Sequence, residues 1–346
     1  QRPTTTPGPA MPRRFLLTPL LALSLAAPLA AAPAARSATP TPAAGPTPPP
    51  ALPLSDQLCG PAVYQHASNR EAVLLVEAAG AELQRRGPAA FSDLRRSGSR
   101  WFQGDRYVFV MSPAGEILVY PPDPQLETAN RNQPANPERS ALLSAASSAV
   151  LNEQGQRMGQ RFLEAAANGQ GCGWVHYRLP KPGQSKPQWK STYVERFETS
   201  GGQVYLVASG AYDARMEQAF AVDEVEAAAD LIAREGRGAF AQLRDPKGRF
   251  VYHDTYVFVN STAGVELVNP AFPGIEGKNV STLRDPAGQF FVRDYIRLAT
   301  SKGSGWVRYS WPRPSDPGSA ANKLTYVRAV QTPDGETLVI GSGLYE

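Results

Sequence analysis

The chain of 346 residues is long enough for two or three domains with sizeable cores. Its formal net charge of +4 comes entirely from residues 1–38, which hold four arginines and no acidic residue. The remainder has no excess of basic residues, so a nucleic-acid-binding protein, which needs a basic face, is set aside.

The N-terminal stretch has the pattern of a secretory signal peptide. Met11 and Arg13-Arg14 precede the apolar segment 15–23, and small residues suited to cleavage follow at Ala30-Ala31-Ala32. A transmembrane anchor is the alternative, but the apolar run is short for a span and is interrupted by prolines. We therefore expect a Sec-type leader over residues 1–38, with the signal at about 11–38, and a periplasmic or secreted protein.

Residues 39–58 are rich in proline, threonine and alanine, which predicts a stiff, disordered tether. The two cysteines of the chain are Cys59 and Cys172. If they pair, they close a loop of over a hundred residues, and the chain-entropy model gives a stabilisation on the order of 4–5 kcal/mol. Two unpaired thiols are the alternative, because the sequence does not give the Cα separation that a disulfide requires.

The rest of the sequence contains one pattern twice. The recurring segments are Tyr107–Val110 with Tyr256–Val259, Gly171–Val175 with Gly303–Val307, and Ser209–Tyr212 with Ser342–Tyr345. Collinear recurrence of this kind indicates two copies of one domain, which we place at residues 59–213 and 214–346.

The sequence of each copy predicts a long helix followed by strands. Apolar residues at helical spacing predict helices over 63–94 and 216–243. Between the second and third strands of each copy lies a lid segment, with helical stretches at 139–166 and 285–301. A helix followed by an antiparallel meander is an α+β fold. The predicted strands are 107–111, 117–120, 174–179, 191–199 and 204–208 in the first copy, and 256–260, 265–269, 306–311, 324–331 and 337–341 in the second.

The ordered set of motifs resembles the Cache domains, small extracellular sensor modules, and specifically their single-Cache type 2 pattern. The second copy carries the resemblance most clearly, whereas the first departs from it between Pro121 and Gly171. The resemblance implies two PAS-like units, each with a long N-terminal helix packed on an antiparallel sheet and a helical lid. The residues that carry it in the second copy are Tyr256–Val259, Asn269-Pro270, Gly277–Asn279, Gly303–Pro312, Lys323, Tyr326-Val327 and Gly341–Tyr345.

The same resemblance implies a function. Cache modules bind a small ligand, often an organic acid, between sheet and lid, and usually precede a transmembrane helix in chemoreceptors or sensor kinases. Because the sequence ends at Tyr345-Glu346, where that helix would begin, we expect a free-standing protein that signals through a membrane partner. Homodimerisation is open. The alternative function is an interaction or dimerisation module whose pockets are filled by its own side chains.

Candidate ligand-binding residues are aromatic and polar residues of the strands, because small-molecule pockets combine apolar walls with a few polar groups. A carboxylate would need a cation, which His176, Arg308 or the two lysines could supply. The alternatives are burial in the core for the aromatic residues and exposure to solvent for Lys190 and Lys323, which precede predicted strands. The candidates are Tyr107, Phe109, Tyr120, Trp174, His176, Lys190 and Tyr193 in the first copy, and Tyr256, Phe258, Asn269, Trp306, Arg308, Lys323 and Tyr326 in the second.

The family pattern usually has a histidine where Tyr120 and Asn269 stand, so the ligand preference of both pockets is open. The three histidines of the chain are scattered and none is at ligand spacing, so no metal site is predicted. No Gly-x-Ser-x-Gly elbow or other catalytic arrangement is present, and we expect neither an enzyme nor a cofactor.

Overall fold

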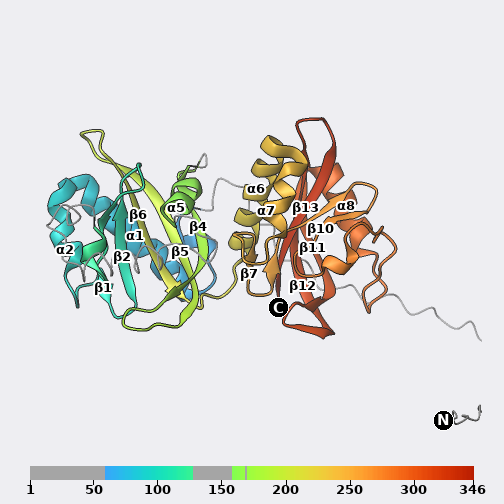
Figure 1. Ribbon diagram of the computed structural model, residues 1–346, viewed down its shortest axis with the longest axis horizontal. Helices are drawn as coiled ribbons and strands as arrows, with labels where there is room; N and C mark the ends of the chain where they lie inside the picture. The colour runs from blue at the N-terminus through green and yellow to red at the C-terminus, as the bar shows by residue number, and fades with distance from the viewer. Residues whose placement is uncertain (1–58, 128–157, 168–169) are drawn as a thin grey trace, which may run out of the picture. The chain divides into compact units, whose positions relative to one another are not determined.

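The computed structural model describes residues 59–127, 158–167 and 170–346 (Figure 1). The predicted leader and most of the first predicted lid helix, 139–166, lie outside the described residues. The helices of the first copy are α1 (Ala67–Arg86), α2 (Phe91–Arg95) and α5 (Met158–Ala166), and those of the second copy are α6 (Gln218–Glu235), α7 (Phe240–Arg244) and α8 (Phe291–Lys302).

The long helices α1 and α6 form where apolar residues at helical spacing meet the sheet. Val76 in α1 and Ile232 in α6 are fully buried in this stripe. Each helix ends at a glycine with positive φ, 55° at Gly87 and 57° at Gly236, a conformation that a Cβ atom disfavours. The chain then turns into α2 or α7 through a short 3-10 helix.

Each copy contains an antiparallel sheet with the same strand order. The order is β2-β6-β5-β4 in the first copy and β9-β13-β12-β11 in the second, and β3 and β10 pair with β2 and β9. The strands of the first copy are β1 (Phe102–Gln103), β2 (Arg106–Met111), β3 (Ile117–Val119), β4 (Cys172–Pro180), β5 (Pro187–Glu198) and β6 (Val204–Tyr212). Those of the second copy are β7 (Val251–Tyr252), β8 (Thr255–Tyr256), β9 (Phe258–Ser261), β10 (Glu266–Val268), β11 (Ser304–Arg313), β12 (Asp316–Gln331) and β13 (Thr337–Tyr345).

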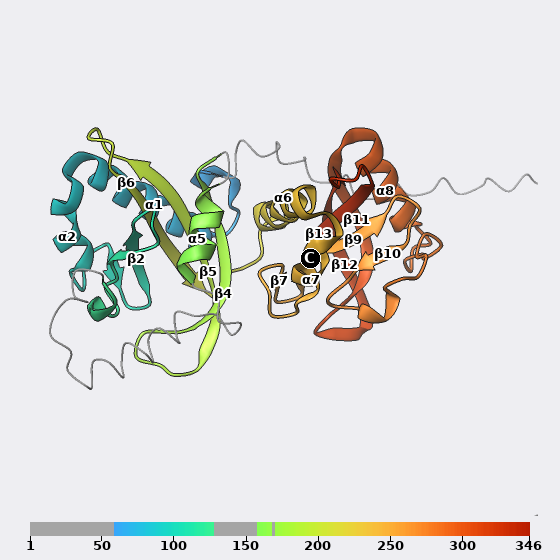
Figure 2. The same ribbon diagram turned by 45° about the horizontal axis from the view of Figure 1, so that its top comes forward.

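Helices cover both faces of each sheet, as Figures 1 and 2 show for α6 and α8. Because successive side chains of a strand point to opposite faces, neighbouring residues enter different cores. In β12, Tyr326 packs in the core under α6, whereas Val327 packs in the core under α8. The first copy repeats this with Tyr193 under α1 and Val194 under α5.

The α+β prediction is confirmed, while several predicted boundaries are wrong. Strand β12 begins at Asp316 rather than at residue 324, so the hairpin with β11 is longer than predicted. Strand β5 likewise begins at Pro187 rather than at residue 191. Helix α8 begins at Phe291 rather than at Asp285, because a turn with a hydrogen bond from the Gly288 amide to the Asp285 carbonyl precedes it.

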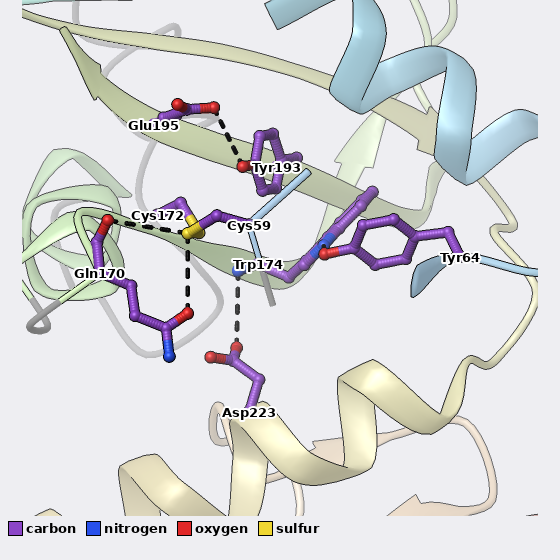
Figure 3. The surroundings of a disulfide bond; sticks show 8 residues. All are labelled: Cys59, Tyr64, Gln170, Cys172, Trp174, Tyr193, Glu195 and Asp223. Carbon is purple, nitrogen blue, oxygen red and sulfur yellow. Dashed lines mark hydrogen bonds between the residues drawn. A yellow bond between two sulfur atoms is a disulfide. The ribbon is translucent and has the colours of Figure 1, made fainter. Parts of the chain in front are cut away.

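A disulfide joins Cys59, which precedes α1, to Cys172 at the start of β4 (Figure 3). The Cα atoms are 5.9 Å apart, within the range for this bond. The alternative of two unpaired thiols is therefore excluded. Figure 3 also shows Trp174 close to this bond. The indole N–H of Trp174 donates to the Tyr64 hydroxyl at 2.8 Å.

Candidate functional site

A cavity lies in the second copy between the sheet and α8. Its volume is about 20 Å³, which is room for a single water molecule. Half of the lining residues are aromatic, and Glu266 and Asn269 provide the charged and amide groups of the wall. The lining residues are Tyr256, Phe258, Glu266, Asn269, Ile275, Val280, Leu283, Phe291, Val292, Tyr295, Tyr309 and Trp311.

Lys323 lies in the same wall of the sheet, fully buried. Its Nζ is 4.0 Å from the ring centroid of Tyr256 and 5.0 Å from that of Tyr345. Among the described residues, this Nζ has no hydrogen-bond partner. Burial lowers the pKa of Lys323 to about 7, while Glu266, Asp254 and Glu224 oppose this decrease by their negative charges.

The expectation that Lys190 and Lys323 are exposed to solvent is wrong. Both side chains are fully buried. The reason is that the strands begin earlier than predicted, so that each lysine lies within a central strand of its sheet. Lys323 is paired with Tyr309 on one side and with Tyr345 on the other.

A hydrogen-bonded group of four side chains, which we call the Glu266 cluster, forms the polar end of the cavity. It consists of Asn260, Glu266, Asn269 and Tyr295. The two amides donate to different oxygens of Glu266, each at 2.7 Å, and the Tyr295 hydroxyl donates to Asn260 Oδ1 at 2.8 Å. Burial raises the pKa of Glu266 to about 7, and the amide hydrogen bonds and Lys323 moderate this increase.

Of these four residues, only Asn269 is among the sequence candidates. Glu266 stands in the predicted strand 265–269, between residues that a two-sided core would bury. An acidic residue within such a strand is the signal that could have identified it, since glutamate is rarely buried without a partner.

The first copy has an equivalent lysine with a similar environment. Lys190 is fully buried, with its Nζ 3.9 Å from the ring centroid of Tyr107 and 5.0 Å from that of Tyr212. Burial lowers its pKa to about 7. The Tyr107 and Tyr120 hydroxyls lie 3.2 Å apart, and the Phe109 ring contacts both tyrosines. The structure therefore brings four of the first-copy candidates together.

Other candidates lie on the opposite face of each sheet. Trp306 packs on Tyr326 in the core under α6, with ring centroids 5.3 Å apart. Arg308 forms an ion pair with Glu346, at 2.6 Å. Trp174 and Tyr193 lie in the core under α1. These residues are thus separated by the sheet from the cavity or from the equivalent position.

His176 is also on the opposite face of the sheet from Lys190, because it pairs with Ser191, whereas Lys190 pairs with Tyr177. Its ring stacks on Tyr252, with centroids 4.3 Å apart, and its Nδ1 is 2.8 Å from the Ser191 hydroxyl. Burial lowers the pKa of His176 to about 3, so the ring is neutral at physiological pH and does not supply a cation for a carboxylate.

The sequence is similar to known sensor proteins. A family model described as Cache domain (dCache_2) matches residues 97–217 and 246–346. The methyl-accepting chemotaxis protein McpP of Pseudomonas putida is 32% identical over 93 residues, 27% of this chain and 16% of the relative. The sensor histidine kinase MctS of Rhizobium johnstonii is 34% identical over 92 residues, 27% of this chain and 19% of the relative. The matched regions thus cover less than a fifth of either relative.

Solved structures of Cache sensor domains are also similar. One, described as the structural basis for carboxylic acid recognition by a Cache chemosensory domain, is 31% identical, with 32% of this chain and 69% of that chain covered and a TM-score of 0.28. A second, the periplasmic sensor domain of a chemotaxis protein, is 31% identical, with 35% and 85% covered and a TM-score of 0.28. Within the described residues of this chain, no helix has the length and apolar character needed to cross a membrane.

Proposed function

Because the chain belongs to the Cache-domain family, we propose that it is an extracytoplasmic sensor module whose second domain binds a short carboxylic acid between the sheet and α8. Lys323 would bind the carboxylate, and Tyr256, Phe258 and Asn269 would line the ligand. Lys190, Tyr107, Phe109 and Tyr120 are the corresponding residues of the first domain.

The observation that carries this proposal is the buried, unpartnered ammonium of Lys323 beside a cavity-lining ring. Burial of a charge without a partner is costly, and the faces of Tyr256 and Tyr345 offset only part of that cost. A ligand carboxylate would supply the missing opposite charge together with charge-assisted hydrogen bonds.

A cavity of about 20 Å³ holds one water molecule but not a carboxylic acid with four or more heavy atoms. Binding therefore requires the lid to move. The lid of the second domain comprises η5 (Pro273–Ile275), the following segment 276–290 and α8. Phe291 and Tyr295 of α8 line the cavity, so a shift of this helix would enlarge it.

The same small volume favours the second candidate function, an interaction module whose pockets are filled by its own side chains. In that case Lys323 would be a costly structural residue, and dimerisation along α1 or α6 would be the function. Ligand binding discriminates between the two functions.

Calorimetry of the full chain with acetate and propionate tests the proposal. In a chain that carries Lys190→Met, we expect a saturable heat that Lys323→Met abolishes, because methionine keeps most of the length of the side chain and removes its charge. A ligand at about 100 times its Kd should also add about 2.7 kcal/mol to the free energy of unfolding. Lys190→Met is the matched variant for the first domain.

The control is Arg308→Ala, which removes a cation on the opposite face of the sheet and should leave binding unchanged. If no short carboxylate binds, or if Lys323→Met binds as the unmodified chain does, the carboxylate function is wrong and the interaction module is favoured.

Export and signalling are further parts of the proposal. The relatives are a chemotaxis protein and a sensor kinase, which supports a role in signalling through a membrane partner of that kind. Cross-linking in intact cells should capture such a receptor in a ligand-dependent manner, and capture of none with or without ligand would contradict this part.

A further inference from the structure

The two domains build the same part of the fold from different chemistry. In the second domain, Asn260 pairs with Glu266 and Val259 with Val268 across β9 and β10. In the first, Met111 pairs with Ile117 and Val110 with Val119 across β2 and β3. The register therefore makes Met111 and Ile117 the equivalents of Asn260 and Glu266.

The lid helices complete this comparison. Phe162 of α5 contacts Phe109, with ring centroids 5.2 Å apart, as Tyr295 of α8 contacts Phe258 at 5.5 Å. Phe162 is thus the equivalent of Tyr295, and Tyr120 is the equivalent of Asn269. The first domain has no carboxyl or amide group at any of the four positions of the Glu266 cluster.

The fold itself does not require the Glu266 cluster, because the first domain forms the same sheet without it. Glu266 is only 3% exposed, and burial of a carboxylate is costly unless the carboxylate is paired. Three of the four cluster residues, Glu266, Asn269 and Tyr295, line the cavity. A polar cluster that the scaffold does not need, placed at a cavity, is accounted for by a ligand.

The hydrogen bonds of the cluster determine what that ligand must offer. Asn269 Oδ1 accepts from the Phe272 amide at 2.8 Å, which leaves the NH2 group of Asn269 to donate to Glu266. The Tyr295 hydroxyl donates to Asn260 Oδ1, which likewise leaves the NH2 group of Asn260 to donate to Glu266. Each oxygen of Glu266 thus accepts one amide hydrogen bond, although a carboxylate can accept about four in total. The Glu266 oxygens can therefore accept further hydrogen bonds, and a ligand group that fits them must be a donor.

The geometry points to a two-ended ligand for the second domain: a short carboxylic acid that carries a hydroxyl or ammonium group. Its carboxylate binds Lys323, and its hydroxyl or ammonium group donates to Glu266. This inference rests on the proposed function for the Lys323 end. The Glu266 end is independent of it and distinguishes the second domain from the first.

Three probes with three carbon atoms each test this inference by calorimetry on the full chain with Lys190→Met, which removes the first domain's lysine. Propionate has no donor, lactate adds a hydroxyl and alanine adds an ammonium group. We expect lactate or alanine to bind at least about tenfold more tightly than propionate, since a site built to hydrogen-bond a donor rejects the analogue that lacks it. A preference for lactate assigns a hydroxyl, and a preference for alanine assigns an ammonium group.

Two variants connect this preference to the cluster. Glu266→Gln should reduce it to less than about threefold, because the amide lacks the charge and half of the acceptor capacity. The exchange Asn260→Met, Glu266→Ile, Asn269→Tyr and Tyr295→Phe should also reduce the preference to less than about threefold, because it installs residues that the first domain already packs at these positions.

The outcomes separate the two proposals. If propionate binds through Lys323 but lactate and alanine bind no more tightly, or if their advantage survives in both variants, the inference is overturned and the carboxylate function stands. If no probe binds, the carboxylate function itself fails, and the inference fails with it.

Discussion

At the scale of single residues, the carboxylate binding that we propose for Lys323 should depend on pH. Only the charged form of the lysine attracts a carboxylate, and burial lowers its pKa to about 7 in the free protein. Above this pH the free site loses its proton, so binding must take up a proton and the apparent affinity falls by about tenfold for each pH unit. We expect the Kd for propionate to rise about tenfold between pH 6 and pH 8.

Glu266 ionises over the same range, because its pKa is raised to about 7 by burial. Its negative charge would weaken carboxylate binding in the same direction as the loss of the Lys323 proton. Calorimetry of Glu266→Gln across this pH range separates the two contributions. An affinity that is equal at pH 6 and pH 8 in both proteins would mean that Lys323 does not bind the carboxylate.

The role of these residues is only partly readable from the sequence. Tyr256, Phe258 and Asn269 are candidates that line the cavity. Lys323 is also a candidate, but its burial is hidden because the segment 316–320 contains proline, glycine and serine, which strands disfavour. Pairing with β11 extends the strand through this segment regardless. Tertiary pairing of this kind leaves no local signal.

At the scale of elements, the faces of β11 illustrate a second limit. The candidates Trp306 and Arg308 are on the face that is turned away from the cavity, whereas Tyr309 and Trp311 line the cavity. Alternation identifies two faces and distinguishes them when one is polar. Here helices cover both faces and both carry aromatic residues, so the pattern cannot decide which face meets the ligand.

The lid of the second domain is the element that ligand binding should alter. Glu276 connects the lid to the rest of the domain. The Glu276 carboxylate accepts from the backbone N–H of Asn269 at 2.6 Å and from the Arg244 side chain at 2.7 Å. We expect ligand to slow backbone hydrogen exchange in residues 273–290 and in the first turns of α8, because closure around a ligand suppresses local opening.

Helix α6 is the internal reference for that measurement. It packs on the opposite face of the sheet, so its exchange should change little. Protection that is uniform over the domain would indicate general stabilisation by the ligand, and unchanged exchange in 273–290 would contradict a moving lid.

At the scale of the whole molecule, the repeat in the sequence predicts the architecture well. Tyr107–Val110 lies in β2, next to β6, and Phe258-Val259 lies in the equivalent strand β9, next to β13, while Tyr256 lies in the short strand β8 before it. Both sheets have the same strand order. The repeat does not by itself show where the domains differ in function. His176 and Arg308 occupy equivalent positions and differ in residue type, yet both lie on the face of the sheet that is turned away from the cavity side. The informative differences, at Ile117 and Glu266, lie in strands whose motifs are weak.

The disulfide and the proposed leader lead to one prediction for the full chain. Protein recovered from the periplasm should lack about residues 1–38 and should contain the Cys59–Cys172 bond, because that compartment is oxidising. Intact mass before and after reduction measures both properties. Recovery of the full-length, reduced chain from the cytoplasm would contradict export.

The same bond changes what a protease can release. Cys59 and Cys172 are 113 positions apart, and they enclose α1, the β2–β3 hairpin and the segment that follows it. A single cut anywhere between them leaves the two pieces covalently joined, so a nicked first domain migrates as one species until a reductant is added. The second domain has Ser304 where the first has Cys172. After a cut in the second domain, no disulfide joins the two pieces, and only non-covalent packing would hold them together.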